Sequence, residues 1–148
     1  MIEDKLYFED AKIGEVIETP GQTVTEADVV RYAGLTGEWD ERFTNAELVR
    51  CSGGEMREVP DLLVLCISLG LGWRGPGPPL ATLALTGFDW QFLRSLRIGD
   101  TIRNRSRMVA KRSLKDSGVI VEEREIVNQR GDLIQSGKIT FLVAKRPR

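Results

Sequence analysis

The chain has 148 residues, with 21 Lys and Arg against 22 Asp and Glu, so its net charge is −1 at neutral pH. This length fits a single domain with a sizeable core, and the balanced charge gives no general attraction to nucleic acid or to an anionic membrane. The sequence contains no histidine, which excludes mechanisms that need an imidazole base and sites that need a histidine metal ligand. We therefore expect no nucleic-acid partner, no membrane partner and no metal.

The cysteine content and the first residues bear on the cellular compartment. The two cysteines are Cys51 and Cys66, and Cys66 lies within an apolar stretch. This usage fits reduced thiols in a cytoplasm better than a disulfide framework. Residues 1–5 lack the basic and then apolar layout of a signal peptide. We expect a cytoplasmic protein.

The chain begins with short β-prone segments over residues 15–19 and 22–24, separated by a Pro-Gly turn. A helix then begins after Thr25, because Thr25 and Asp28 have the spacing of a capping box. The helix is expected to end at Gly34, since glycine is the usual residue just beyond a helix C-terminus.

A loop over residues 35–43 leads to a second predicted helix start. Thr44 and Glu47 have the spacing of another capping box, and Phe43 with Leu48 has that of a hydrophobic staple. This short helix is expected to end near Cys51.

The most apolar stretch runs from Pro60 to Trp73. Proline suits the first position of a helix, and Asp61 places negative charge at the positive end of the helix dipole. The residues from Leu62 to Leu71 are apolar or small on every side, which predicts a helix that is buried all round. The stretch is shorter than the roughly 20 apolar residues needed to span a bilayer.

The second half of the chain has the pattern of strands joined by short polar turns. Four strands are predicted, over residues 80–92, 101–111, 119–127 and 133–143. One long helix followed by these strands predicts an α+β fold, in which an antiparallel sheet wraps around the central helix. The strands are expected to pair in sequence order as a meander.

Candidate catalytic carboxylates lie in the loop before the second helix and at the start of the central helix. They are Glu38, Asp40, Glu41 and Asp61. A loop held between two capped helices suits a general base. The alternative is that these acids are solvated or cap local backbone, and that Asp61 only interacts with the helix dipole.

Three arginines alternate along one predicted strand and therefore share one face of it: Arg103, Arg105 and Arg107. Glu123 and Glu125 on the next strand have the matching spacing for cross-strand pairs. The arginines either bind phosphates, such as those of coenzyme A, or belong to a charge-paired outer face.

Several short segments, in their order and spacing around the long helix, carry a resemblance to a known family: Tyr7-Phe8-Glu9-Asp10, Ile13-Gly14, Thr23 to Val29, Ala33 to Gly37, and Arg97-Ile98-Gly99-Asp100-Thr101. Together they resemble the MaoC-like (R)-specific enoyl-CoA hydratases and dehydratases. The resemblance covers nearly the whole chain. It implies a single hotdog domain over residues 1–148, side-by-side dimers, an acyl thioester bound at the dimer interface, and no cofactor.

The resemblance also shows where this chain departs from the family. The family uses an Asp, four intervening residues and a His in the loop after the first helix, and the matching positions here are Glu38 and Phe43. A family His-Gly pair at the start of the central helix falls on Pro60 and Asp61. Backbone N–H groups there hold the thioester carbonyl in the family. Proline lacks one such group, and an ionised aspartate opposes negative charge on that oxygen.

Glu38 is thus the one catalytic candidate, and the resemblance implies a thioester-binding set: Asp40, Phe43, Pro60, Asp61 and Leu62. One hypothesis is an acyl-CoA-binding or partner subunit without the usual dyad. It would bind acyl-CoA or an acyl-carrier thioester, and form a homodimer or a heterodimer with a related hotdog chain. The alternative is a hydratase or thioesterase with Glu38 as its sole base. A third option is a structural homodimer without a ligand.

Overall fold

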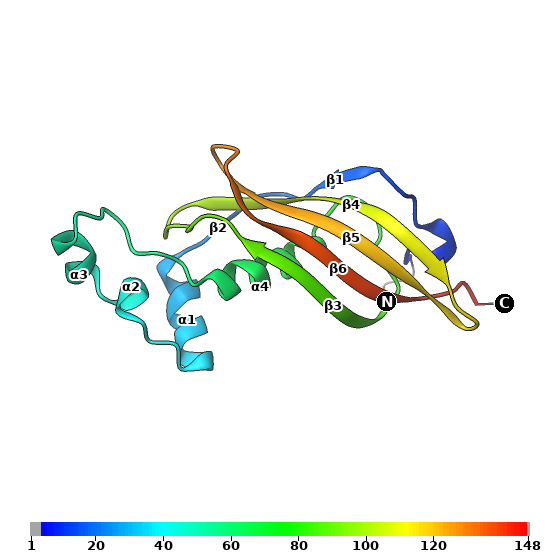
Figure 1. Cartoon of the computed structure of the whole chain (residues 1–148), viewed down its shortest axis with the longest axis horizontal. Helices are drawn as coiled ribbons and strands as arrows, with labels where there is room; N and C mark the ends of the chain where they lie inside the picture. Colours follow the sequence, from blue (N-terminus) through cyan, green and yellow to red (C-terminus); the bar gives the residue numbers. More distant parts are fainter. Residues whose placement is uncertain (1–3, 148) are drawn as a thin grey trace.

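The computed structural model describes residues 4–147 and has a long, curved antiparallel sheet with helix α4 against one face (Figure 1). The helices are α1 (Glu26–Thr36), α2 (Glu41–Thr44), α3 (Ala46–Cys51) and α4 (Asp61–Gly72), after a 3-10 turn at Phe8–Asp10. The strands are β1 (Val16–Glu18), β2 (Gln22–Thr23), β3 (Thr82–Phe92), β4 (Thr101–Ser113), β5 (Ser117–Asn128) and β6 (Leu133–Ala144). The predicted α+β fold, an antiparallel sheet around a central helix, is confirmed.

The strand order of the sheet is β1-β4-β5-β6-β3, with β2 also paired to β4. The predicted meander is correct for β4, β5 and β6, but it is wrong for β3, which pairs with β6 and not with β4. The connection from β3 to β4 is not a hairpin. Its Leu96 is fully buried, and the Leu96 carbonyl accepts a hydrogen bond from Val59 N–H at 2.8 Å. The connection therefore crosses the end of the core and leaves β3 at an edge of the sheet.

The helix boundaries test the predicted caps. The Thr25 N–H donates to Asp28 Oδ2 at 2.8 Å, so the first capping box is confirmed. Helix α1 continues past Gly34 and ends at Thr36, because the residue that adopts the left-handed conformation is Gly37, with φ +78°. The predicted end at Gly34 is therefore wrong by two residues.

The second predicted cap is wrong by one residue. Asn45, not Thr44, caps α3, and Asn45 Oδ1 accepts hydrogen bonds from Glu47 N–H and Leu48 N–H, each at 3.1 Å. Thr44 is instead the last residue of α2, and its hydroxyl donates to the Asp40 carbonyl at 3.0 Å. Asparagine caps a helix at least as well as threonine does, so two adjacent candidates competed for one position.

Helix α4 packs one side against the sheet. Val64 is fully buried and Leu71 is 1% exposed, in a core cluster that also contains residues of β4, β5 and β6. The prediction that this helix is buried all round is wrong for the single chain, because Leu62 is 53% exposed and Cys66 is also exposed. The sheet covers one side of the helix only. Pro60 is the N-cap of the helix and not its first residue.

One close contact at the far end of the sheet yields a stability prediction. A Cβ added to Gly118 would lie 2.0 Å from Cδ2 of Phe8, whereas a Cβ added to Gly87 would meet nothing within 4 Å. Gly118→Ala should therefore lower the free energy of unfolding by about 1–3 kcal/mol through overpacking. Urea unfolding measures this loss, with Gly87→Ala as the matched control. Equal stability of the two variants would contradict the packing described here.

Candidate functional site

Glu38 lies just beyond the C-terminus of α1, where Gly37 turns the chain out of the helix. The Glu38 N–H donates to Thr36 Oγ1 at 3.2 Å, and Glu38 Oε2 accepts a hydrogen bond from the Tyr32 hydroxyl at 2.8 Å. The Glu38 side chain is exposed to solvent, so a bound substrate can reach it. One contact thus fixes the Glu38 backbone and the other orients its carboxylate, which stays accessible.

Tyr32 is a site residue that the sequence did not indicate. Burial, together with the hydrogen bond to Glu38 and its negative charge, raises the pKa of Tyr32 to about 12. The phenol therefore stays protonated at neutral pH and acts as a hydrogen-bond donor that positions Glu38. The only sequence signal was its place one turn before the end of the helix that precedes the acidic loop.

Asp40 has a structural role in this loop. It is the N-cap of α2, and its carboxylate accepts hydrogen bonds from the Arg42 backbone N–H at 2.9 Å and from Arg42 Nε at 3.1 Å. These bonds to Arg42 lower the pKa of Asp40. The carboxylate is thus ionised, and both of its oxygens bond to Arg42.

Phe43, at the position that the resemblance matches to the family histidine, points into the core. Its side chain is 5% exposed and belongs to the same buried cluster as Val59 and Leu63, and the Arg42 guanidinium lies 5.1 Å from its ring centroid. The expected staple with Leu48 is wrong, because α3 begins one residue later than predicted and Leu48 is 43% exposed. Phe43 therefore fills core volume beside α4.

The N-terminus of α4 has free backbone donors. The first helical hydrogen bond runs from Val64 N–H to the Pro60 carbonyl at 3.2 Å, so the N–H groups of residues 61–63 have no acceptor within the helix. The buried Gln135 side chain holds this end in place by donating to the Asp61 carbonyl at 2.8 Å. Gln135 in turn accepts a hydrogen bond from Trp90 Nε1 at 2.9 Å, which connects the start of α4 to the edge strand β3.

The charges of the loop and its surroundings act on Asp61 at the start of α4. Burial raises the pKa of Asp61, and the negative charges of Glu58 and Glu38 raise it further, while Arg42 opposes the shift. The negative charge of Glu38 therefore acts on the Asp61 carboxylate, which links the loop electrostatically to the start of α4. Leu62 lies beside them with its side chain 53% exposed, whereas Phe43 is turned away into the core.

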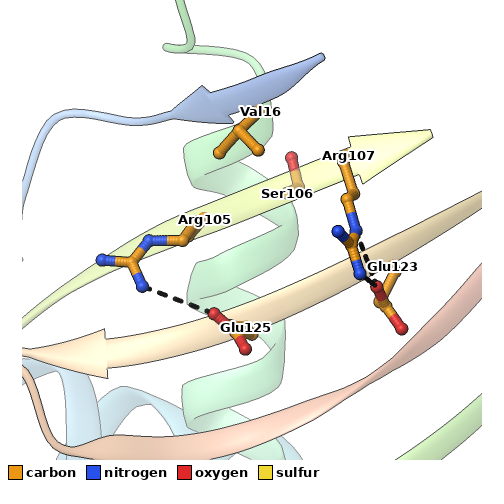
Figure 2. A pocket seen from close by; sticks show the side chains of 6 residues that line it. All are labelled: Val16, Arg105, Ser106, Arg107, Glu123 and Glu125. Carbon is orange, nitrogen blue, oxygen red and sulfur yellow. Dashed lines mark hydrogen bonds and ion pairs between the residues drawn. The ribbon is translucent and has the colours of Figure 1, made fainter. Parts of the chain in front are cut away.

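The outer face of the sheet carries paired charges. Arg107 Nη2 lies 2.6 Å from Glu123 Oε2, and Arg105 Nη1 lies 3.6 Å from Glu125 Oε2, so the predicted cross-strand pairs are confirmed. Figure 2 shows these side chains on the face turned away from α4, around a hollow of about 150 Å³ that Val16 also lines. These charges neutralise one another on exposed strands, and the hollow is lined by Val16 and by residues of β4 and β5, not by Glu38 or Asp61. We therefore place the candidate site at the start of α4 and not here.

Among residues 4–147, no group of three or more histidine, cysteine or acidic side chains has the arrangement of a metal site. Cys51 and Cys66 are both free thiols. No helix in this part of the chain has the length and apolarity that crossing a membrane requires.

The chain matches a protein-family model and is similar to a curated protein. Residues 11–136 match the family model described as the FAS1-like dehydratase domain region. The chain is similar to β-methylmalyl-CoA dehydratase of Chloroflexus aurantiacus, with 27% identity over 144 residues; the match covers 95% of this chain and 40% of that enzyme. The chain thus spans well under half of the curated relative.

Two solved structures are also similar. A monoamine oxidase regulatory protein from Archaeoglobus fulgidus has 33% identity and a TM-score of 0.86, with 99% of each chain covered. A putative MaoC domain dehydratase from Chloroflexus aurantiacus has 26% identity and the same TM-score of 0.86, with 97% of this chain and 41% of that chain covered.

The Tyr32–Glu38 hydrogen bond leads to a titration prediction. The pKa of Tyr32 is raised to about 12 because burial and the Glu38 charge both favour the neutral phenol. Glu38→Gln removes the charge but not the burial, so the pKa should fall toward 10 without reaching it. Ultraviolet difference titration, in a Tyr7→Phe background that leaves one tyrosine, measures the midpoint. An unchanged midpoint would show that Glu38 does not face Tyr32.

Proposed function

Because the chain belongs to the FAS1-like dehydratase family and is a MaoC-like hotdog domain, we propose that it is an acyl-thioester-binding partner subunit with little hydratase activity of its own. One observation carries this proposal. The chain has no histidine, and Phe43, which matches the catalytic histidine position of the family, is 5% exposed in the core. A dyad of carboxylate and imidazole cannot form here.

Hydration of an enoyl thioester needs one group to activate water and a second group to deliver a proton. Glu38 supplies one group. Its hydrogen-bond partner Tyr32 has a pKa of about 12 and is a poor proton donor at neutral pH. Losing one general acid–base group typically lowers the rate by about 10²–10⁴-fold.

The oxyanion site is altered as well. Pro60 has no N–H, and the Asp61 carboxylate stands at the start of α4, where negative charge would develop on a thioester oxygen. Weakening such a site typically costs a further 10²–10³-fold or so. The free N–H groups at the start of α4 still favour a bound carbonyl oxygen, which supports binding without turnover.

The exposed apolar surface supports a partner chain. Strand β3 is an edge strand whose Leu83, Leu85, Phe88 and Phe92 side chains are 42–59% exposed. Leu62 of α4 and Trp73, the C-cap of α4, are exposed as well. An unpaired strand edge with large apolar side chains is a template for another strand. We propose that a second hotdog domain covers this surface, either a copy of this chain or a related chain that retains the Asp and His. The curated relative, of which this chain spans 40%, is long enough to contain a second such unit.

The second candidate function is an acyl-thioester hydratase or thioesterase that uses Glu38 alone as general base. The Tyr32 hydroxyl, 2.8 Å from Glu38 Oε2, favours it, because an oriented and accessible carboxylate is what a general base requires. Thioester hydrolysis needs a base to activate water, so it is the reaction this arrangement suits better.

One experiment separates these functions. The purified chain should show no measurable hydration of crotonyl-CoA and no hydrolysis of acyl-CoA, while saturating acyl-CoA should raise the Tm by several degrees, since ligand at about 100 times Kd adds about 2.7 kcal/mol. Turnover that disappears in Glu38→Gln would contradict the partner-subunit proposal and support the single-carboxylate enzyme. An unchanged Tm would indicate a structural dimer without a ligand.

A second prediction addresses the partner surface. Phe88→Arg places a charge at the β3 edge, where Phe88 is 42% exposed, and should convert a dimer into a monomer without unfolding it. Sedimentation velocity measures the association, with circular dichroism as the check on folding. The matched control is Leu35→Arg, because Leu35 is 87% exposed on α1 and lies outside this surface. A wild-type monomer, or a Phe88→Arg dimer, would contradict the proposed interface.

A further inference from the structure

A charged cluster lies inside the molecule, between the second half of α4 and strands β4 and β5. Glu122 and Arg124 are 8% and 5% exposed, and Arg124 Nε lies 2.6 Å from Glu122 Oε1. Arg124 Nη1 also donates to the Ser68 carbonyl at 3.1 Å and lies 3.4 Å from the Ser68 hydroxyl. Asn104 Nδ2 donates to the same carbonyl at 2.7 Å. Two strands thus direct polar side chains at one turn of the helix.

The charged cluster interrupts an otherwise apolar face of β5. Residues two apart on a strand share a face, so Ile120 and Ile126 show that apolar side chains fill the same inner face of β5. A buried ion pair is often no more stabilising than apolar residues of similar volume, because both charges lose their hydration. The cluster is therefore a candidate for recognition of a ligand.

The cluster has unused hydrogen-bonding capacity. Asn104 is 1% exposed, yet its Oδ1 atom has no hydrogen-bond partner, which makes it the one orphaned buried polar side-chain atom among residues 4–147. Arg124 bonds to Glu122 through Nε and to Ser68 through Nη1. Its third guanidinium nitrogen, Nη2, takes no part in these bonds and lies beside Gly72 at the end of α4. An acceptor without a donor thus lies in the same cluster as a guanidinium N–H₂ group that these bonds leave free.

The position along α4 connects the cluster to the candidate site. Asp61, Leu65, Ser68 and Gly72 have helical spacing and share one face of α4. Ser68 lies roughly 10 Å beyond Asp61, at about 1.5 Å per residue. With a thioester carbonyl at the start of α4, as in the proposed function on which this inference rests, an acyl chain that follows this face would pass from the exposed Asp61 into the core beside Ser68, which is fully buried.

We propose that Asn104 and Arg124, held by Ser68 and Glu122, bind a hydroxyl group on the acyl chain of the thioester. A hydroxyl fits because its O–H can donate to Asn104 Oδ1 while its oxygen accepts from Arg124 Nη2. A plain alkyl chain would leave both groups unpaired, and a carboxylate would place a second anion beside Glu122 and offer no donor to Asn104. The ligand class is therefore a hydroxylated acyl thioester of medium length.

Isothermal titration calorimetry of the full chain tests this with octanoyl-CoA, 8-hydroxyoctanoyl-CoA and the eight-carbon dicarboxylic mono-CoA ester. We expect the hydroxylated thioester to bind about tenfold more tightly than octanoyl-CoA, since it satisfies groups that the alkyl chain leaves unpaired. Asn104→Leu and the double variant Glu122→Leu/Arg124→Met should each abolish this ratio. If Asn104→Leu does not fold, the double variant provides the test, because removing both members of a buried ion pair is well tolerated.

The control is Arg107→Met/Glu123→Leu, which removes an ion pair from the same two strands on the opposite face and should keep the tenfold ratio. Equal binding of octanoyl-CoA and 8-hydroxyoctanoyl-CoA, or tightest binding of the dicarboxylic ester, would overturn this inference and leave the proposed function standing. Binding of none of the three thioesters would overturn the proposed function and the inference with it.

Discussion

The apolar surface of helix α4 is larger than the part of it that the sheet of one chain buries, and the account of this structure depends on that difference. Helix α4 is apolar on nearly every side, but the sheet of one chain covers only the side that includes Val64 and Leu71. Leu62 and Trp73 stay exposed, and the edge strand β3 exposes further large apolar side chains. Apolar surface of this extent is costly in water at roughly 25 cal/mol per Å².

The candidate site lies at the same boundary between core and exposed surface. Asp61 and the exposed Leu62 stand at the start of α4, and the negative charge of Glu38 helps to raise the pKa of Asp61. Phe43, at the position that matches the family histidine, is part of the core on the other side of this boundary. The proposed function rests on this arrangement, because one accessible carboxylate and free helix amides suit the binding of a thioester better than its hydration. This contrast explains why family membership alone does not assign an activity to the chain.

Local chemistry in the sequence predicted the local structure well. The Thr25–Asp28 capping box, the hairpin at residues 128–132 and the pairing of Arg105 and Arg107 with Glu125 and Glu123 follow from spacing alone. Asn45 replaced Thr44 as a cap because adjacent residues of similar capping strength cannot be ranked from spacing. The pairing of β3 with β6 depends on a connection that crosses the core, which no local pattern encodes.

The functional details were less accessible to prediction for physical reasons. The run Glu122-Glu123-Arg124-Glu125 alternates between the two faces of β5, and only the register of the sheet shows that Glu122 and Arg124 face the core. Tyr32 becomes part of the site because Gly37 turns the chain back over α1. The uncovered side of α4 was unpredictable from periodicity, which identifies apolar residues but not which chain covers them.

Hydrogen–deuterium exchange of the β3 amides in the purified native assembly tests the central claim most directly. Half of these amides point away from β6, and in an isolated chain they face solvent at the edge of the sheet. If a second hotdog domain pairs with this edge, both sets of β3 amides should exchange slowly, and those that point away from β6 should become fast in Phe88→Arg. Fast exchange of that set in the native assembly would show that β3 is a free edge, and would contradict the account.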